Sequence, residues 1–220
     1  MQGTIGIIYL SVFQALKTKF IEGGPFFMGL ITLTLIFGLA FCLERIIYLN
    51  LAHIPAKKFL SKIGSHLEKG DLKEAQAISR QTRGPVAAIS SQALAKIEEP
   101  IELIDKTITS TGNVQIGLLE KNLSWITLFI AIAPALGFLG TVLGMIQTFD
   151  DVQRAGDITP TIVSAGMKVA LITTVGGLIV AIILQIFYNY LLNKVENIIN
   201  DMENQSIAIL DMIVRYKRLR

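Results

Sequence analysis

Three apolar runs, at about residues 25–48, 123–149 and 161–192, constrain the fold of this chain more than any other feature of its sequence. A helix needs about 20 apolar residues to cross the hydrocarbon core of a bilayer. Inside that core each backbone N–H and C=O must be satisfied without water, which favours helices. Charged residues make up only 17% of the chain and gather between the runs. The sequence therefore predicts an all-α membrane protein with three transmembrane helices.

The polar segments between the runs differ in charge. Residues 49–122 carry nine Lys or Arg residues between Lys57 and Lys106, whereas the loop 150–160 has one Arg and three Asp residues. Loops rich in Lys and Arg stay in the cytoplasm. We therefore expect residues 49–122 and the C-terminus in the cytoplasm, and the N-terminus and the loop 150–160 on the opposite side of the membrane.

Both ends of the chain and the middle segment read as helical. Residues 1–24 predict a periplasmic amphipathic helix lying in the membrane interface, with its apolar face at Ile8, Leu10, Phe13, Leu16 and Phe20. Within residues 49–122, Asp71 is a predicted N-cap for a helix from Leu72 to Arg80. Residues 193–220 continue an apolar periodicity after the third run, and Ile101 to Leu123, before the second run, is helix-compatible. The second and third membrane helices are therefore predicted to extend into a cytoplasmic helical bundle. Glu44 and Arg45 are typical of a charged stop at the membrane surface.

Composition excludes several classes of function. The net charge of +3 and pI near 9.0 come without a basic stripe interleaved with aromatics, so no nucleic-acid partner is expected. Cys42 is the single cysteine, which rules out an intrachain disulfide. No phosphate-binding Gly-Lys loop, His-Glu-x-x-His, Cys-x-x-Cys or Gly-x-Ser-x-Gly motif is present. We expect no enzymatic activity, cofactor or metal.

The second run carries residues that lipid contact does not explain. Pro134 interrupts the backbone hydrogen bonds, and Gly140 removes a side chain. A stripe at helical spacing adds small and hydroxylated residues: Gly137, Thr141, Gly144 and Thr148. Such a stripe faces protein or water. Helix packing alone and a polar path are both open interpretations.

The third run has a matching stripe, which includes Gly166, Ala170, Thr174, Gly177, Ala181, Gln185 and Tyr188. The two stripes are predicted to face a common interior, or their threonines bond only to carbonyls of their own helix. Neither run contains an Asp or Glu within the membrane, so a proton path built from this chain alone lacks a carboxylate.

Two motifs resemble a known family. Ala133-Pro134 with residues 136–146 resembles the second transmembrane helix of the MotA/TolQ/ExbB proton-channel family, and residues 170–178 resemble its third-helix motif. The ExbB/TolQ branch, with three spans, is the more similar one. Thr141 and Thr174 match that family's polar threonines.

The resemblance implies a function and a set of partners. It implies a channel-forming subunit in the inner membrane of a Gram-negative bacterium, arranged as a pentamer around a single-span ExbD/TolR-like partner that carries a membrane aspartate. The complex would use the proton motive force to energise a TonB-like protein for outer-membrane transport. A TolQ-like envelope-integrity subunit and a non-conducting scaffold are the alternatives, and a MotA-like stator ranks below them. The cargo and the choice of H⁺ or Na⁺ stay open.

The candidate site follows from these motifs. Residues expected to line the ion path are Thr141, Thr174, Thr148 and Thr173. Residues expected to form the packing or pore stripe are Pro134, Gly137, Gly140, Gly144, Ala170, Gly177 and Ala181.

One position departs from the family. Val169 stands where ExbB and TolQ sequences have a glutamate, and Lys168 precedes it. A lysine in an apolar span snorkels, pairs or faces water. Lys168 either snorkels or is a counter-charge for Asp150 or Asp151 of a neighbouring subunit, or for an acid on a partner.

The stripes also predict a homo-oligomer, because no second such surface within the chain is expected to cover each of them fully. On this reasoning, Gly144→Leu disrupts assembly.

Overall fold

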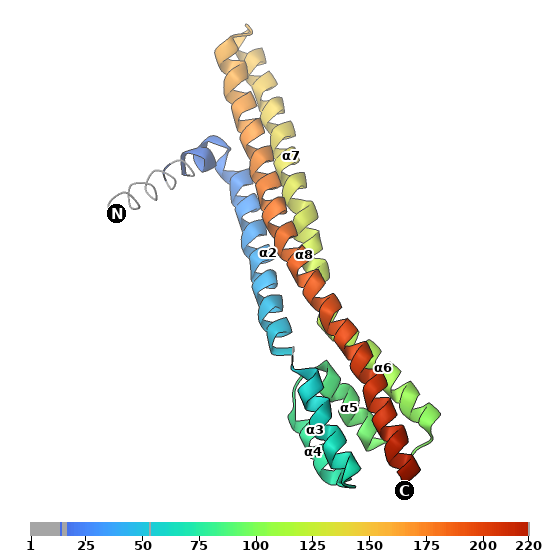
Figure 1. Ribbon diagram of the computed structural model, residues 1–220. Coiled ribbons are helices and arrows are strands. Elements are labelled where there is room, and N and C mark those ends of the chain that lie inside the picture. Colours follow the sequence, from blue (N-terminus) through green and yellow to red (C-terminus); the bar gives the residue numbers. More distant parts are fainter. Residues whose placement is uncertain (1–13, 15–16, 53, 220) are drawn as a thin grey trace, which may run out of the picture. The chain divides into compact units, whose positions relative to one another are not determined.

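The computed structural model describes residue 14, residues 17–52 and residues 54–219 (Figure 1). Among these residues the chain is helical and contains no strand. Three helical stretches, which contain α2 (Pro25–Ala52), α7 (Leu123–Ala155) and α8 (Pro160–Leu219), are long and apolar enough to cross a membrane. The predicted fold class of three membrane helices is therefore confirmed. Most of the predicted interfacial helix, including Ile8, Leu10, Phe13 and Leu16, falls outside the described residues, although residues 17–22 are helical.

The first of two compact units contains the described residues up to Cys42, together with Ser124–Tyr188. In it α7 and α8 lie side by side, with α2 next to α8 (Figure 1). Aromatic rings join α2 to α7: Phe41 stacks on Trp125 at a centroid distance of 6.0 Å and on Phe129 at 5.9 Å. Gly38 of α2 leaves room for the Leu184 side chain of α8. Large apolar side chains such as Phe138 and Ile186 point outward, as expected of lipid-facing or partner-facing surfaces.

The second unit consists of Leu43–Leu123 and the residues from Asn189 onward. Its short helices are α3 (Ala56–Glu68), α4 (Leu72–Gln81), α5 (Pro85–Ala95) and α6 (Ile101–Glu120), and each packs on the next along the chain. The C-terminal part of α8 joins them, since Met212 lies against Gly64 of α3. The fully buried side chains of this core include Ile63, Ile89, Leu94, Ile104, Ile209 and Ile213. The predicted helical extension of the third span is thus one helix continuous with it.

Local signals set several helix boundaries. Asp71 caps α4 by accepting a hydrogen bond from the Glu74 N–H at 3.3 Å, which confirms the predicted N-cap. The helix-compatible stretch before the second span is not continuous with it. α6 ends at Glu120, Lys121 is extended, and Asn122 has a φ of 67° before α7 begins. Asparagine tolerates this left-handed conformation better than most residues do, which explains a break without Gly or Pro.

Arg45 is not only a charged stop, because its side chain is buried to 3% exposure in the second unit. It donates to both carboxylate oxygens of Glu44, at 2.7 and 2.6 Å, and to the Leu118 carbonyl at 3.3 Å. Its guanidinium also lies 4.5 Å from the centroid of the Tyr48 ring. A buried guanidinium needs such partners to offset its desolvation, so Arg45 ties the end of α2 to α6.

Candidate functional site

The small-residue stripes of α7 and α8 pack against each other within this chain. A Cβ added to Gly137 would lie 2.8 Å from the Thr173 carbonyl oxygen, and one added to Gly140 would lie 2.9 Å from the Thr173 Cβ. A Cβ at Gly177 would overlap the Ala133 carbonyl oxygen. The glycines are therefore required for close backbone approach, as in small-residue membrane packing generally.

This packing overturns the premise from which an oligomer was predicted. Each stripe does find a second stripe to cover it, and that stripe belongs to the same chain. Gly144 is the loosest of these contacts, because an added Cβ would lie an ordinary 3.5 Å from the Ala170 Cβ. The two stripes consequently carry no argument for a homo-oligomer, and Gly144 is not the position where bulk is least tolerated.

Thr141 and Thr174 meet between the two helices, as the facing stripes predicted. Thr141 Oγ1 donates to the Ala170 carbonyl at 2.8 Å and is in hydrogen-bond contact with Thr174 Oγ1. The Gly137 carbonyl lies 3.3 Å from each of the two hydroxyl oxygens. Both threonines are half-buried. Their hydroxyls thus form a small polar cluster inside an otherwise apolar helix pair.

Thr148 and Thr173 behave differently. Their side chains are 3% and 1% exposed. Thr148 donates to the Gly144 carbonyl at 2.8 Å and Thr173 donates to the Ala170 carbonyl at 2.8 Å, each within its own helix. These two hydroxyls therefore bond to carbonyls of their own helix, which is the second of the two interpretations of the stripes. That they line an ion path stays a prediction.

The remaining stripe positions lie on or beside the same interface. Ala170 is buried, whereas Pro134 and Ala181 are half-buried. Pro134 stands inside α7 without ending it. Because proline has no N–H, the Ile130 carbonyl lacks its usual helical donor.

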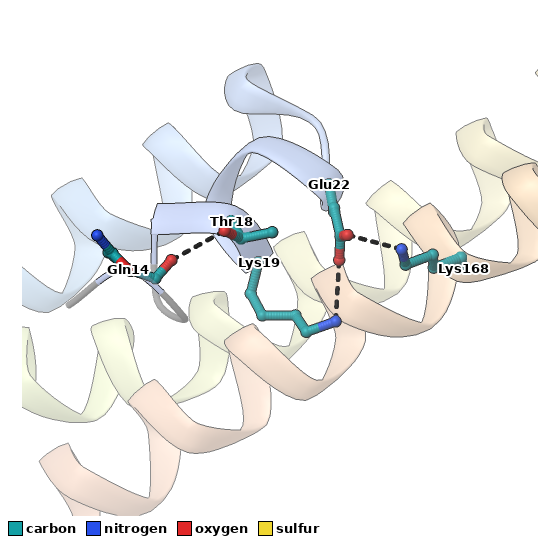
Figure 2. Close-up of polar contacts among 5 residues, drawn as sticks. All are labelled: Gln14, Thr18, Lys19, Glu22 and Lys168. Carbon is teal, nitrogen blue, oxygen red and sulfur yellow. Dashed lines mark hydrogen bonds and ion pairs between the residues drawn. The ribbon is translucent and has the colours of Figure 1, made fainter. Parts of the chain in front are cut away.

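The partner of Lys168 is Glu22 of the same chain, not one of the acids named from the sequence. Lys168 Nζ lies 2.7 Å from Glu22 Oε1, and Lys19 Nζ lies 2.9 Å from Glu22 Oε2, so the carboxylate bridges two lysines (Figure 2). Asp151 instead lies 3.6 Å from Arg154. Lys168 is 51% exposed and Glu22 is 27% exposed.

Two glycines after Glu22 make this contact feasible. Gly24 has a φ of +81°, which favours glycine, and Gly23 lies so close to α8 that an added Cβ would be 2.7 Å from Ile172 Cγ2. The Gly-Gly-Pro sequence at residues 23–25 ends the preceding helical segment and starts α2. It also brings the preceding carboxylate against α8, beside Val169.

The hydrogen bond from Lys168, followed by that from Lys19, holds the pKa of the Glu22 carboxyl below its usual value of 4.5. A lowered pKa means that the contact stabilises the folded chain above pH 4.5 and is lost as the pH falls through the lowered value. The ion pair is exposed, so its stabilisation is small and weakens with salt.

Replacing Lys168 by methionine is expected to loosen residues 17–24 from α8, since Glu22 then keeps only Lys19. Hydrogen–deuterium exchange at pH 7 should show faster exchange in residues 17–24. Lys17→Met, in the same helical segment but outside the ion pair, is the matched control. Equal exchange in the wild type and Lys168→Met would show that this ion pair does not hold the segment.

The chemistry available at the Thr141–Thr174 cluster is limited. Hydroxyls donate and accept hydrogen bonds but do not ionise near neutral pH. The sequence places no Asp or Glu in the spans beside them. Among the described residues no group of three or more His, Cys, Asp or Glu side chains forms a metal site.

Comparison with known proteins identifies the family. The sequence pattern of the MotA/TolQ/ExbB proton channel family matches residues 80–204, which is more than half of this chain. The chain belongs to the MotA/TolQ/ExbB proton channel family, which is a transport family rather than a class of enzymes.

The curated relatives place it on the ExbB-like side of that family. The putative biopolymer transport protein ExbB homolog of Methanothermobacter thermautotrophicus is 31% identical over 169 residues, covering 76% of this chain and 60% of the relative. Biopolymer transport protein ExbB of Aquifex aeolicus is 40% identical over 85 residues, covering 39% of this chain and 57% of the relative. Biopolymer transport protein exbB1 of Vibrio cholerae is 44% identical over 64 residues, 29% of this chain and 28% of the relative. The chain therefore spans less than two thirds of the length of each.

Proposed function

We propose that this protein is the channel-forming subunit of an ExbB-type inner-membrane complex that uses the proton motive force to drive transport. The observation that carries the proposal is the pair of hydroxyls from Thr141 and Thr174, held together between two apolar helices of a proton-channel family member. The relatives are named as biopolymer transport proteins, which supports a role in transport for this chain.

In this proposal the cluster serves a carboxylate that a partner supplies. A membrane aspartate on an ExbD/TolR-like single-span protein approaches the two hydroxyls, which stabilise its charged form by hydrogen bonds. Neutral and charged forms of that aspartate alternate as protons enter and leave. One charge crossing 100 mV supplies about 2.3 kcal/mol, so useful work requires several protons for each transport event. A TonB-like protein receives that work.

A homo-oligomer, with five copies by family resemblance, completes the path by enclosing the partner between the copies. The outward apolar surfaces of α2, α7 and α8 are available for contacts between copies and for lipid. In the alternative, a TolQ-like role in envelope integrity, the same proton movement would supply work to a protein other than a TonB-like one.

The experiment that tests the proposed function compares cells with and without the gene. Uptake of a large nutrient across the outer membrane should fall on deletion, return with the wild-type gene, and stop when an uncoupler removes the proton motive force. A non-conducting scaffold predicts uptake that survives the uncoupler. That result would exclude the proposed function.

We also propose that residues 49–122 lie in the cytoplasm and the loop 150–160 in the periplasm. This topology is based on the nine Lys and Arg residues between Lys57 and Lys106. An Asp157→Cys variant should react with a membrane-impermeant maleimide in intact cells, and a Lys73→Cys variant only after lysis. Both positions are exposed, and native Cys42 is buried. If only the Lys73→Cys variant reacted in intact cells, the protein would have the opposite topology.

A further inference from the structure

A groove of about 820 Å³ lies in the second unit, away from the threonine cluster. Its walls come from the last turns of α2, the end of α4, the start of α5 and the middle of α6. That volume falls in the range of pockets that hold small organic ligands, roughly 300–1,000 Å³. Its lining residues belong to neither of the two small-residue stripes.

One side of the groove is basic. Arg80 and Arg83 line it, and neither Asp nor Glu is among the described residues that do so. Both arginines are exposed. α5 begins at Pro85 beside them, after Gly84 with a φ of +117°, so the partial positive charge of a helix N-terminus faces the same region. Arginine forks match the oxygens of a phosphate group.

The lining from α2 and α6 includes apolar side chains, and α2 is one of the membrane helices. Tyr48 and Leu51 come from the end of α2, and Val114 and Leu119 come from α6. Leu51 is 71% exposed and Val114 is 61% exposed, so apolar surface is open on both helices. Along α6 the lining runs from Ser110 to Leu119, about 13 Å at 1.5 Å per residue.

We propose that this groove binds an anionic phospholipid, with its phosphate at Arg80 and Arg83 and the start of an acyl chain along Leu51 and Val114. The positive charges of Arg80 and Arg83 favour an anion, and the exposed side chains of Leu51 and Val114 favour a ligand with an apolar chain over a free phosphate. Among the described residues, the lining holds no carboxylate to meet the ammonium of a zwitterionic headgroup, so phosphatidylglycerol is favoured over phosphatidylcholine. Hydroxyl and amide side chains, including Thr111 and Gln115, are available to the glycerol and ester oxygens.

The test is native mass spectrometry of the full-length protein, stripped of lipid in detergent and then given phosphatidylglycerol or phosphatidylcholine. The wild type should retain at least tenfold more phosphatidylglycerol than phosphatidylcholine. An Arg80→Gln, Arg83→Gln double variant should lose that preference by about tenfold or more. Lys62→Gln with Lys73→Gln, which removes the same charge from exposed positions of α3 and α4 outside the groove, should retain it.

Two further outcomes decide the source of the phosphate and the role of the groove. Glycerol phosphate added in excess should not displace the lipid, and displacement would replace the lipid proposal with a soluble anion. A Val114→Asp variant replaces one of the apolar side chains with a negative charge and should also lose the preference. Equal retention of both lipids by the wild type, or an unchanged preference in the arginine double variant, would overturn the proposal.

Discussion

Gly177→Leu is expected to abolish the folded α7–α8 pair, and this is the largest structural effect of any single substitution proposed for this protein. Even a Cβ at this position would overlap the Ala133 carbonyl oxygen and lie 3.2 Å from the Gly137 Cα. These are backbone atoms, which cannot rotate away as a side chain does. Overpacking costs about 1–3 kcal/mol when neighbours relax, and a leucine against backbone should exceed that range.

Gly29→Leu is the matched control, because no atom lies within 4 Å of a Cβ added there, on another membrane helix. Membrane levels and thermal unfolding in mild detergent should be near normal for Gly29→Leu and strongly reduced for Gly177→Leu. A finer comparison uses alanine at the same two stripes. Gly144→Ala should change thermal stability little, and Gly177→Ala should lower it clearly. Equal stability of these two variants would mean that the two helices do not pack in this register.

Much of the fold was predictable because membrane helices leave strong periodic signals. Long apolar runs indicated the spans, the charge difference indicated a topology, and the spacing of Thr141 and Thr174 placed both on small-residue stripes. Periodicity shows which face of a helix is special, but it does not show what that face contacts. The stripes were predicted to face a common interior but also to need contacts between copies to cover them, whereas the structure covers each stripe with the other within one chain.

Other features depend on contacts that no local pattern encodes. Glu22 and Lys168 are 146 residues apart in sequence, and the ion pair exists because Gly23 and Gly24 permit a tight approach to α8. The burial of Arg45 was missed for a similar reason, since its acceptor on Leu118 belongs to α6. A charged pair at the end of an apolar run looks the same in sequence whether it faces water or a helix.

Replacing both Thr141 and Thr174 by valine is expected to reduce proton-motive-force-dependent uptake by one to two decades. Valine preserves the shape and removes the hydroxyls, so a partner carboxylate would lose hydrogen bonds worth roughly 1.5–3 kcal/mol. The pair also loses its own bonds to the Ala170 carbonyl and between the two side chains, so membrane levels must be measured alongside uptake.

Thr148→Val with Thr173→Val is the matched control for this experiment. Both hydroxyls are buried and donate within their own helix, Thr148 to the Gly144 carbonyl and Thr173 to the Ala170 carbonyl that also accepts from Thr141. The control therefore removes two buried hydroxyls and leaves the contact between Thr141 and Thr174 in place. Because both hydroxyls are occupied by carbonyls of their own helix, uptake should be close to normal in this control at equal membrane levels, and that result would remove Thr148 and Thr173 from the predicted ion path. Loss of uptake in both double variants would assign the effect to helix packing and not to the cluster.

The most direct measurement of the central claim is proton flux into liposomes that contain this protein with its single-span partner, driven by a membrane potential and followed with an internal pH-sensitive dye. The wild-type complex should acidify the lumen, the Thr141→Val, Thr174→Val complex should do so at least tenfold more slowly, and the Thr148→Val, Thr173→Val complex should match the wild type. Unchanged flux after removal of both cluster hydroxyls, in complexes of equal amount, would contradict the claim that this pair lines the proton path.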